Sequence, residues 1–398
     1  MGADDDLARA RGWVAHLLAG GTTPWTAWTG RADPASTGPA STGPASTDVP
    51  GWDGPLPGAQ HLEVLRRLNG LGAPDPALAR TVLATAPPGR GALDLRLAGL
   101  PNRGYGARAV DPEALPADEL LRVAVGALAD RLATADLPER PVPTLRRRLE
   151  DEARARLPRR HPFRLVGPRA RVDPVRRRLQ ELGRTPGGRG AVHYVVGADT
   201  GRLVVDAWAA RAAEGTAPTW PEWLTTWVER DSCPPRADLA AVAARWGARE
   251  HVGAVEVVLD VGALTGLLAT PAPVTAPPPP SAAATELVRR VSTALATEVE
   301  RGRRARLTAE VLAPRAVRLD AGGEPLRVPG RHHDWLARRG RALARDLAAG
   351  GYRVHGPTGL LEDPPAHGVP APQDDAVLRL ALLVLGDPDR PDPSEVSA

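Results

Sequence analysis

The sequence predicts an α/β protein in which helices flank a parallel sheet and a mainly helical N-terminal region precedes it. After residue 160, short apolar runs alternate with segments of helical periodicity, and this alternation is typical of parallel sheets. Before residue 140, the apolar residues recur at helical spacing. Hydrophobic residues make up 42% of the 398, which suffices for one or two cored domains.

The N-terminal region, residues 1–140, is expected to be built from helices. They are predicted over 5–19, over 58–70, from Pro76 to about Ala84, and from near Pro116 to at least Leu132. The helix pair around Gly70-Leu71-Gly72 also fits a helix-turn-helix DNA-binding motif, but such pairs are common and this reading is disfavoured. Residues 34–47 repeat Pro, Ala, Ser, Thr and Gly, a composition that predicts a disordered insertion.

The α/β domain is expected over residues 160–386, with its first strands at 163–166, 192–196 and 252–259. The third strand is apolar on both faces apart from Glu256, as strands buried in a parallel sheet are. Asp173, with Pro174 at the first helical position, is predicted to cap the helix that runs to Gly183.

The rest of the domain continues the alternation. Thr219 and Glu222 form a capping box ahead of a helix, since Glu222 lies three residues after Thr219. The remaining predicted elements are helices around 203–208, 236–246, 284–312 and 333–349, a Pro-rich loop at 270–281, a strand at 352–355 and a disordered tail at 387–398.

Lysine is absent, so all 51 basic residues are arginine. This excludes a phosphate-binding loop ending in Gly-Lys-Ser/Thr, a Lys Schiff base and a kinase-type Lys. Codon usage in a GC-rich genome is the simplest cause, so arginine richness alone does not indicate nucleic-acid binding.

Cys233 is the only cysteine, which excludes an internal disulfide and a Cys-based zinc site, and we interpret it as a structural thiol.

One segment is strongly basic. Residues 140–189 hold 16 arginines and five acidic residues. Such a block favours phosphate or another polyanion, nucleic acid included. The competing interpretation, which we favour, is the solvated surface of a basic helix.

No apolar run reaches the roughly 18 to 20 residues needed to span a bilayer. The first residues, Met1 to Asp6, are acidic where a signal peptide is basic. The sequence therefore predicts a cytoplasmic protein without membrane insertion.

Four pieces of the α/β region follow one another in a familiar order. They are Phe163 to Pro168 with the helix after it, Tyr194 to Trp208, Pro221 to Leu224 with Ala244 to Gly247, and His333 to Leu336 with Gly351 to Gly356. Together they resemble the sulfotransferase-like proteins of GC-rich bacteria, which have a P-loop-type α/β fold. The resemblance covers about residues 160–365. It implies a parallel sheet with 163–166 at its centre and a phosphosulfate-binding loop after that strand.

The positions that would carry this family's chemistry differ. The stretch 167–174 has no Lys, Ser or Thr, its two prolines remove N–H donors, and Asp173 puts negative charge where a phosphate would sit. Where the family holds the 3′-phosphate with Arg and Ser, this chain has Ala198 and Asp206, and the Asp206 carboxylate would repel a phosphate. The adenosine phosphosulfate donor is therefore disfavoured, and no cofactor is expected.

Candidate site residues follow from this comparison and from their places in the predicted elements. For an anion they are Gly167, Arg169, Arg171 and Arg202. The catalytic candidates are His355, at a strand end, and His333, at a helix start. His193 is interpreted as a core histidine. No metal site is expected, because neighbouring side chains such as His332 and His333 point about 100° apart on a helix.

Five of the ten tryptophans lie close together, at positions 208, 220, 223, 227 and 246. They could stack on a sugar or a base, or pack helices onto the sheet, and their helical spacing favours packing.

The sequence thus predicts a divergent sulfotransferase-fold protein, without standard sulfotransferase activity, that binds an anionic or glycan ligand. Two alternatives stay open. One is an active transferase that uses arginine in place of the phosphate-loop lysine. The other is a nucleic-acid-associated protein that uses the block at 140–189.

Overall fold

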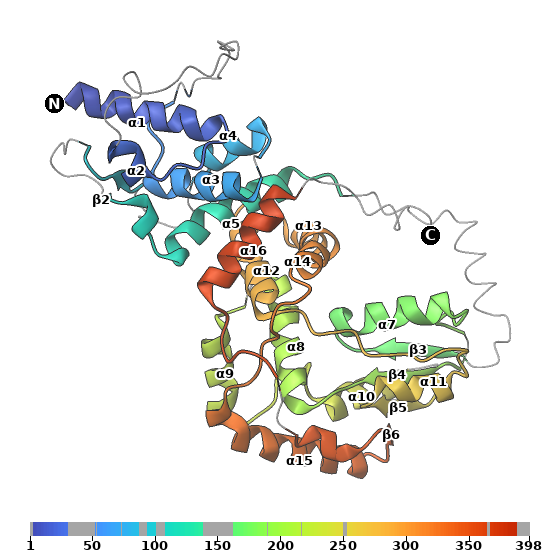
Figure 1. Ribbon diagram of the computed structural model, residues 1–398. Coiled ribbons are helices and arrows are strands. Elements are labelled where there is room, and N and C mark those ends of the chain that lie inside the picture. The colour runs from blue at the N-terminus through green and yellow to red at the C-terminus, as the bar shows by residue number, and fades with distance from the viewer. Residues whose placement is uncertain are drawn as a thin grey trace. The chain divides into compact units, whose positions relative to one another are not determined.

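The computed structural model describes residues 3–30, 52, 54–72, 74–86, 94–100, 108–137, 162–188, 190–215, 217–249, 253–363 and 367–387 (Figure 1). The insertion expected at 34–47, the part of the basic block before residue 162 and the tail after Asp387 lie outside these residues. The chain divides into two compact units. We call Met1–Ala135, Glu286–Asp320 and Gln373–Ala398 the helical unit, and Asp136–Thr285 with Ala321–Pro372 the sheet unit.

The helical unit consists largely of helices, as the apolar spacing predicted. They are α1 (Ala3–Leu18), α2 (Trp25–Gly30), α3 (Ala59–Leu71), α4 (Pro76–Ala84), η1 (Pro112–Ala114), α5 (Ala117–Thr134), most of α12 (Ala282–Leu295), α13 (Arg301–Arg306), η3 (Leu307–Leu312), α14 (Ala313–Leu319) and α16 (Asp374–Gly386). Two short strands, β1 (Arg96–Leu97) and β2 (Ala109–Val110), pair in parallel. The strand pair and α16 were not expected from the sequence.

Helices α3, α5 and α16 pack on one another at the centre of the helical unit (Figure 1). Both α5 and α16 bury residues around most of their circumference, as helices inside a core do. A side chain also ties them together, since Nη1 of Arg131 on α5 donates to the Leu385 carbonyl of α16 at 2.7 Å. Residues 254 positions apart in the chain thus form one core.

The single helix predicted over 284–312 is wrong. Helix α12 ends at Leu295, and Glu300 starts α13 by accepting the N–H groups of Gly302 and Arg303 on its carboxylate, at 2.9 and 3.2 Å. A side-chain cap of this kind satisfies donors that a continuing helix would bond to its own carbonyls. The following η3 is a π-helix, in which the N–H of Ala313 bonds the carbonyl of Thr308.

Four parallel strands form the sheet of the sheet unit. They are β3 (Phe163–Val166), β4 (Val192–Val196), β5 (Val255–Val258) and β6 (Arg353–His355), hydrogen-bonded in that order. An α/β architecture with a parallel sheet flanked by helices is therefore confirmed. The expectation that 163–166 is central is wrong, because β3 lies at an edge of this four-stranded sheet. Strand order depends on how each crossover packs, which the strand sequences do not encode.

Helices cover both faces of the sheet. On one face, α7 (Arg169–Glu181) and α11 (Leu264–Leu267), which follows η2 (Val261–Ala263), pack against the side chains of Phe163, Tyr194 and Val258. On the other face, apolar residues of several helices enclose Val166, Val195 and Val257. These helices are α8 (Thr200–Ala213), α9 (Trp220–Glu229), α10 (Leu239–Gly247) and α15 (His333–Ala349). Figure 1 shows α7 and α15 on opposite sides of the strands.

Polar caps begin the helices after β4. The carboxylate of Asp199 accepts the N–H of Arg202 at 2.7 Å and starts α8. The capping box predicted for α9 is confirmed, with Oε2 of Glu222 2.9 Å from the N–H of Thr219. These caps fix where the helices leave the sheet.

Helix α7 begins five residues earlier than predicted. Pro168 is its N-cap, and the Pro168 carbonyl accepts the N–H groups of Arg171 and Val172 at 3.0 and 2.9 Å. Pro174 consequently lies inside the helix, and Asp173 pairs with Arg176 instead of capping. The Asp-Pro pair resembles a helix start, but burial of Val172 already requires helix in the preceding turn.

The division into units differs from the domains expected at 1–140 and 160–386. Residues 286–320 and those from 373 onward group with the N-terminal helices, because α16 packs on α5 and α3 and α14 packs on α16. The Pro-rich stretch 270–281 carries neither helix nor extended strand, as expected of a loop. The sheet unit is therefore interrupted by a piece of the helical unit.

Candidate functional site

The carboxyl ends of the four strands meet at one edge of the sheet, which we call the carboxyl edge. Parallel α/β proteins bind ligands there, because loops and helix N-termini converge on it. Gly167 follows β3, Gly197 follows β4 and Gly356 follows β6. A Cβ atom at Gly197 would lie 2.7 Å from Cδ1 of Leu239, and one at Gly356 would lie 2.9 Å from the backbone nitrogen of Asp260. Close packing at this edge thus requires glycine.

A buried cluster of three charged side chains lies beside the ends of β3 and β4. Arg171 of α7 donates from Nε and Nη2 to Oδ2 of Asp206, at 3.0 and 2.6 Å, and from Nη1 to the Gly197 carbonyl at 2.6 Å. Arg202, one turn before Asp206 on α8, places Nε 2.7 Å from the other carboxylate oxygen, Oδ1. The side chain of Asp206 is 3% exposed. One buried carboxylate is thus shared by two guanidinium groups.

A second carboxylate, that of Asp199, lies within electrostatic reach of both arginines. Asp199, the next acidic group, has its pKa raised mainly by burial, although its hydrogen bond and the charges of Arg171 and Arg202 act the other way. Burial lowers the pKa of Arg202 as well, but an arginine stays protonated in proteins. The closest contact of Arg202 with an acid is through Nε, the charge of Asp199 also acts on it, and its Nη atoms donate no hydrogen bond to a described residue. The guanidinium group of Arg202 is the feature of this cluster that an anion would complement.

The start of α7 adds further donors. The first N–H groups of a helix, here those of Arg169 and Ala170, have no acceptor within the helix. Arg169 itself is exposed and forms no ion pair with a described residue. Gly167 adopts φ 156°, and a Cβ there would lie 3.0 Å from Cγ2 of Val172. Because Asp173 lies in the second turn, its charge does not occupy the helix start, which corrects the sequence interpretation.

The four predicted anion-binding residues therefore have different surroundings in the structure. Arg171 and Arg202 meet at Asp206, Gly167 forms the turn into α7, and Arg169 points to solvent. Sequence reasoning missed Asp206 as their partner and interpreted it as a group that repels phosphate. The spacing of Arg202 and Asp206, four residues apart on a helix, was the available signal.

His355, a catalytic candidate, lies at the end of β6 and pairs with a neighbouring strand. Its Nε2 is 2.5 Å from Oε2 of Glu256 on β5, and its ring meets Tyr194 edge-on at 6.3 Å. The side chains of His355 and Glu256 are 12% and 14% exposed. A histidine oriented by a carboxylate is a common acid–base arrangement. In the sequence, Glu256 stands out as the polar residue of an otherwise apolar strand.

Three other described histidines of the sheet unit, His193, His332 and His333, have structural partners. His333 begins α15, and its Nε2 lies 3.3 Å from the Val328 carbonyl. His332 accepts from Nε of Arg331 at 3.0 Å. His193 is buried, contacts the Ala191 carbonyl through Nδ1 and packs on Trp246, and its pKa is lowered chiefly by burial. The geometry gives none of the three a catalytic partner.

The clustered tryptophans pack against the core. Trp208 and Trp220 are fully buried, and their indole N–H groups donate to the carbonyls of Pro218 and Pro370 at 3.1 Å. Trp223 and Trp227, expected to be mostly buried, are half-buried and meet edge-on at 5.4 Å. Their indole nitrogens are buried, and the guanidinium carbon of Arg230 lies 5.6 Å from the centroid of the Trp227 ring.

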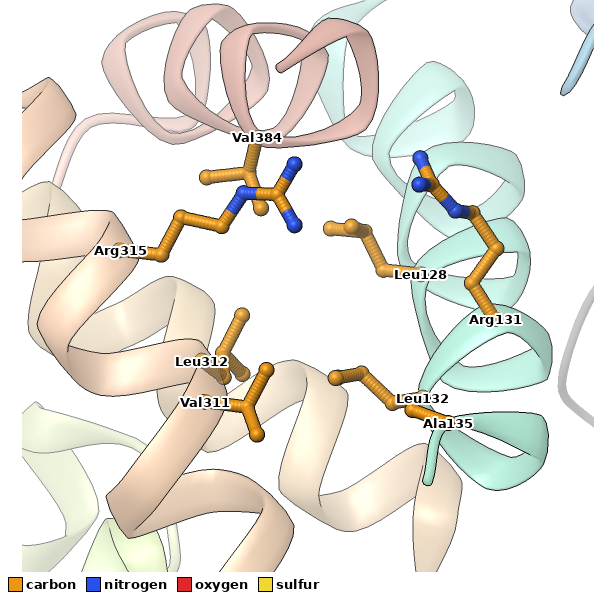
Figure 2. Close-up of a pocket in the computed structure, with 8 residues that line it drawn as sticks. All are labelled: Leu128, Arg131, Leu132, Ala135, Val311, Leu312, Arg315 and Val384. Carbon is orange, nitrogen blue, oxygen red and sulfur yellow. The ribbon is translucent and has the colours of Figure 1, made fainter. Parts of the chain in front are cut away.

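Two of the pockets among the described residues lie in the helical unit. The first is a small one, about 40 Å³, between α5, η3, α14 and α16 (Figure 2). Both of its arginines already donate hydrogen bonds within the protein. Arg131 donates to the Leu385 carbonyl, and Arg315 donates to Oδ2 of Asp387 at 2.8 Å. The second, about 570 Å³, lies beside His61 and is considered below.

Two classes of feature are missing from the described residues. None of their helices combines the length and the apolar character that crossing a bilayer requires. No group of three or more His, Cys, Asp or Glu side chains among them is placed to hold a metal ion.

Comparisons with protein-family models, with curated proteins and with solved structures give no match for this chain.

Proposed function

We propose that the sheet unit is a binding module for a small anionic molecule, which it holds at the carboxyl edge. The observation that carries this proposal is the sharing of one buried carboxylate, Asp206, by Arg171 and Arg202. Arg171 is fixed by three hydrogen bonds and acts as internal support. Arg202, whose Nη atoms donate no hydrogen bond to a described residue, is the residue that contacts the anion.

The helix start supports the same ligand chemistry. The N-terminus of α7 carries partial positive charge and free N–H groups, and Arg169 adds a mobile guanidinium group. An anion here would meet charge-assisted donors from both the backbone and a side chain. Trp223 and Trp227 are half-buried and meet edge-on, and Trp227 also contacts Arg230, which favours an anion over a glycan.

The position of β3 counts against the sulfotransferase resemblance as a guide to activity. The resemblance requires 163–166 at the centre of the sheet, and β3 lies at an edge. The adenosine phosphosulfate donor therefore remains disfavoured. The pairing of His355 with Glu256 keeps an acid–base function as the second candidate, at the ends of β5 and β6.

Calorimetric titration with inorganic phosphate, inorganic sulfate and adenosine 3′,5′-bisphosphate tests the proposal. We expect phosphate or sulfate to bind, and Arg202→Gln to weaken binding about tenfold or more, as loss of a charged hydrogen bond does. Arg177→Gln is the control. It also replaces an arginine by glutamine, but at an exposed position of α7, the helix that begins with Arg169. The bisphosphate should bind no better than phosphate.

Two results would contradict the proposal. Equal loss of binding in the Arg177 and Arg202 variants would indicate a diffuse basic surface. In that case a single-stranded DNA oligonucleotide should bind with steep salt dependence, which would support the nucleic-acid alternative. Micromolar affinity for the bisphosphate, lost in Arg169→Ala, would support the transferase alternative.

A further inference from the structure

The larger pocket of the helical unit has the composition of a small-molecule site. It lies where the start of α3 meets the end of α4 and the segments around residues 55 and 94, and its volume is about 570 Å³. Most of its wall is apolar, from Trp52, Pro55, Leu56, Pro57, Leu83, Ala84 and Ala86. Three polar residues join them: His61, Thr85 and Asp94. Apolar walls with a few convergent polar groups are typical of ligand pockets of this size.

The imidazole of His61 is held in one orientation. The residue is 2% exposed, and its Nε2 lies 2.8 Å from the Thr85 carbonyl oxygen. A carbonyl only accepts, so Nε2 must carry the proton of the neutral ring. Burial, the largest influence, lowers the pKa of His61 and favours this neutral form. Nδ1 is then an acceptor.

This acceptor is buried and has no hydrogen-bond partner among the described residues. Its nearest charged neighbour is Oδ1 of Asp94, 4.0 Å away, which is also an acceptor. The Gly58 backbone is also close, since a Cβ there would lie 3.0 Å from Nδ1, and its interaction with the ring raises the pKa of His61, though less than burial lowers it. Two acceptors, Nδ1 of His61 and Oδ1 of Asp94, thus face one another with no donor from a described residue between them. A buried acceptor without a hydrogen bond is unfavourable.

The described residues around this gap supply no donor to it. Gln60 donates from Nε2 to Oδ1 of Asp94 at 3.3 Å, and its carbonyl oxygen accepts the N–H of Leu95 at 3.0 Å. The Thr85 hydroxyl is directed to the Thr81 carbonyl and to Asp130, at 2.8 and 3.1 Å. The carboxylate of Asp94 is thereby positioned while its side chain stays 58% exposed at the pocket.

We propose that this pocket binds a small molecule with an apolar body and a protonated amine, whose N–H groups bridge Nδ1 of His61 and Oδ1 of Asp94. The amine supplies the missing donor and the opposite charge, and the apolar body fills the wall between Trp52 and Leu83. This site is separate from the anion site proposed for the sheet unit, and neither depends on the other.

Titration of the full chain with benzylamine, phenethylamine and tryptamine tests the proposal, with benzyl alcohol as the uncharged comparison. We expect at least one amine to bind about tenfold or more tightly than the alcohol. The Nδ1 resonance of His61, observed by ¹⁵N NMR, should shift when the amine binds. Asp94→Asn should weaken amine binding about tenfold and leave alcohol binding unchanged. Asp118→Asn, at an exposed acid on α5, is the control and should change neither.

Folding does not obscure this test, because the Asp94 side chain is largely exposed and asparagine keeps its shape. His61→Gln provides a second variant, judged only if its thermal melting is cooperative. Equal binding of amine and alcohol, with no effect of Asp94→Asn, would overturn the proposal in favour of an unselective apolar pocket. The absence of any binding at 10 mM or so, or an Nδ1 resonance that does not move, would overturn it in favour of a water-filled gap.

Discussion

Nη2 of Arg171 lies 2.6 Å from Oδ2 of Asp206, and this buried contact joins the first turn of α7 to the second turn of α8. The two helices follow adjacent strands and cover opposite faces of the sheet. The ion pair therefore connects the two helical layers at the carboxyl edge. Its desolvation is offset only because three hydrogen bonds to Arg171 satisfy the buried guanidinium group.

Removing the shared carboxylate should destabilise the sheet unit strongly. Asp206→Asn would leave Arg171 and Arg202 buried without their counter-ion, and breaking such a pair typically costs about 3–5 kcal/mol of unfolding free energy. Urea denaturation followed by tryptophan fluorescence measures this. Glu181→Gln, which removes an exposed partner of Arg178, should cost about 1 kcal/mol or less. Similar losses in both variants would show that the buried pair has no special role.

Asp199→Asn should stabilise the protein near neutral pH. Asparagine keeps the cap oxygen that accepts the N–H of Arg202, but it carries no charge. Because burial raises the pKa of Asp199 in the folded state, the native aspartate opposes folding once it ionises, above the folded pKa. The gain from asparagine should therefore be largest near pH 7 and should disappear as the pH falls below the unfolded pKa, about 3.9. Denaturation curves at pH 7 and pH 4 compare the two proteins, and a gain that grows on acidification would refute this reasoning.

Cys233 should react slowly with thiol reagents in the folded protein. Burial raises its pKa to about 11, so only about one thiol in a thousand is ionised at pH 8. An exposed thiol with a pKa of about 8.5 should react roughly two orders of magnitude faster. Ellman's reagent, applied with and without urea, gives both rates. Rapid labelling of the native protein would mean that this part of the sheet unit opens readily.

Two helical glycines should respond to alanine in opposite directions. Gly340→Ala in α15 would place a Cβ 2.1 Å from the Leu361 carbonyl oxygen, which also accepts the hydroxyl of Thr200 at 2.6 Å. The backbone would have to shift, and overpacking of this kind costs about 1–3 kcal/mol. Gly70→Ala in α3 meets no atom within 4 Å and should gain up to about 1 kcal/mol of helix propensity. Thermal melting of both variants tests this prediction. If both alanine variants were stabilised, the contact between α15 and the Leu361 carbonyl would be looser than the structure shows.

Local patterns predicted the individual elements well where one signal dominated. The bounds of β3 and β4 agree with the predicted strands, because both are short apolar runs with clear ends. The capping box of Thr219 and Glu222 is present. The start of α7 was misplaced because Asp173-Pro174 imitates a helix start, while the true cap, Pro168, offers no side-chain signal.

The candidate sites were harder to predict from the sequence than the secondary structure was. Arg171 and Arg202 could be named as anion-binding candidates, but their sharing of Asp206 depends on the packing of α7 and α8. The pocket beside His61 could not be predicted, since Asp94 lies 33 residues further along and no motif links the two. Its distinguishing feature is an acceptor without a donor, which exists only once the neighbouring groups are in place.

The sequence by itself determined the α/β class, most helices and strands, and the exclusion of lysine and disulfide chemistry, because these depend on local periodicity and composition. Only the tertiary structure decided that β3 is an edge strand, that α16 belongs with α5, and that Asp206 neutralises arginines instead of repelling a phosphate. The physical reason is that each of these depends on contacts between residues far apart in the chain. Such contacts are selected by the packing of whole faces and by the pairing of buried charges, and no single segment encodes them.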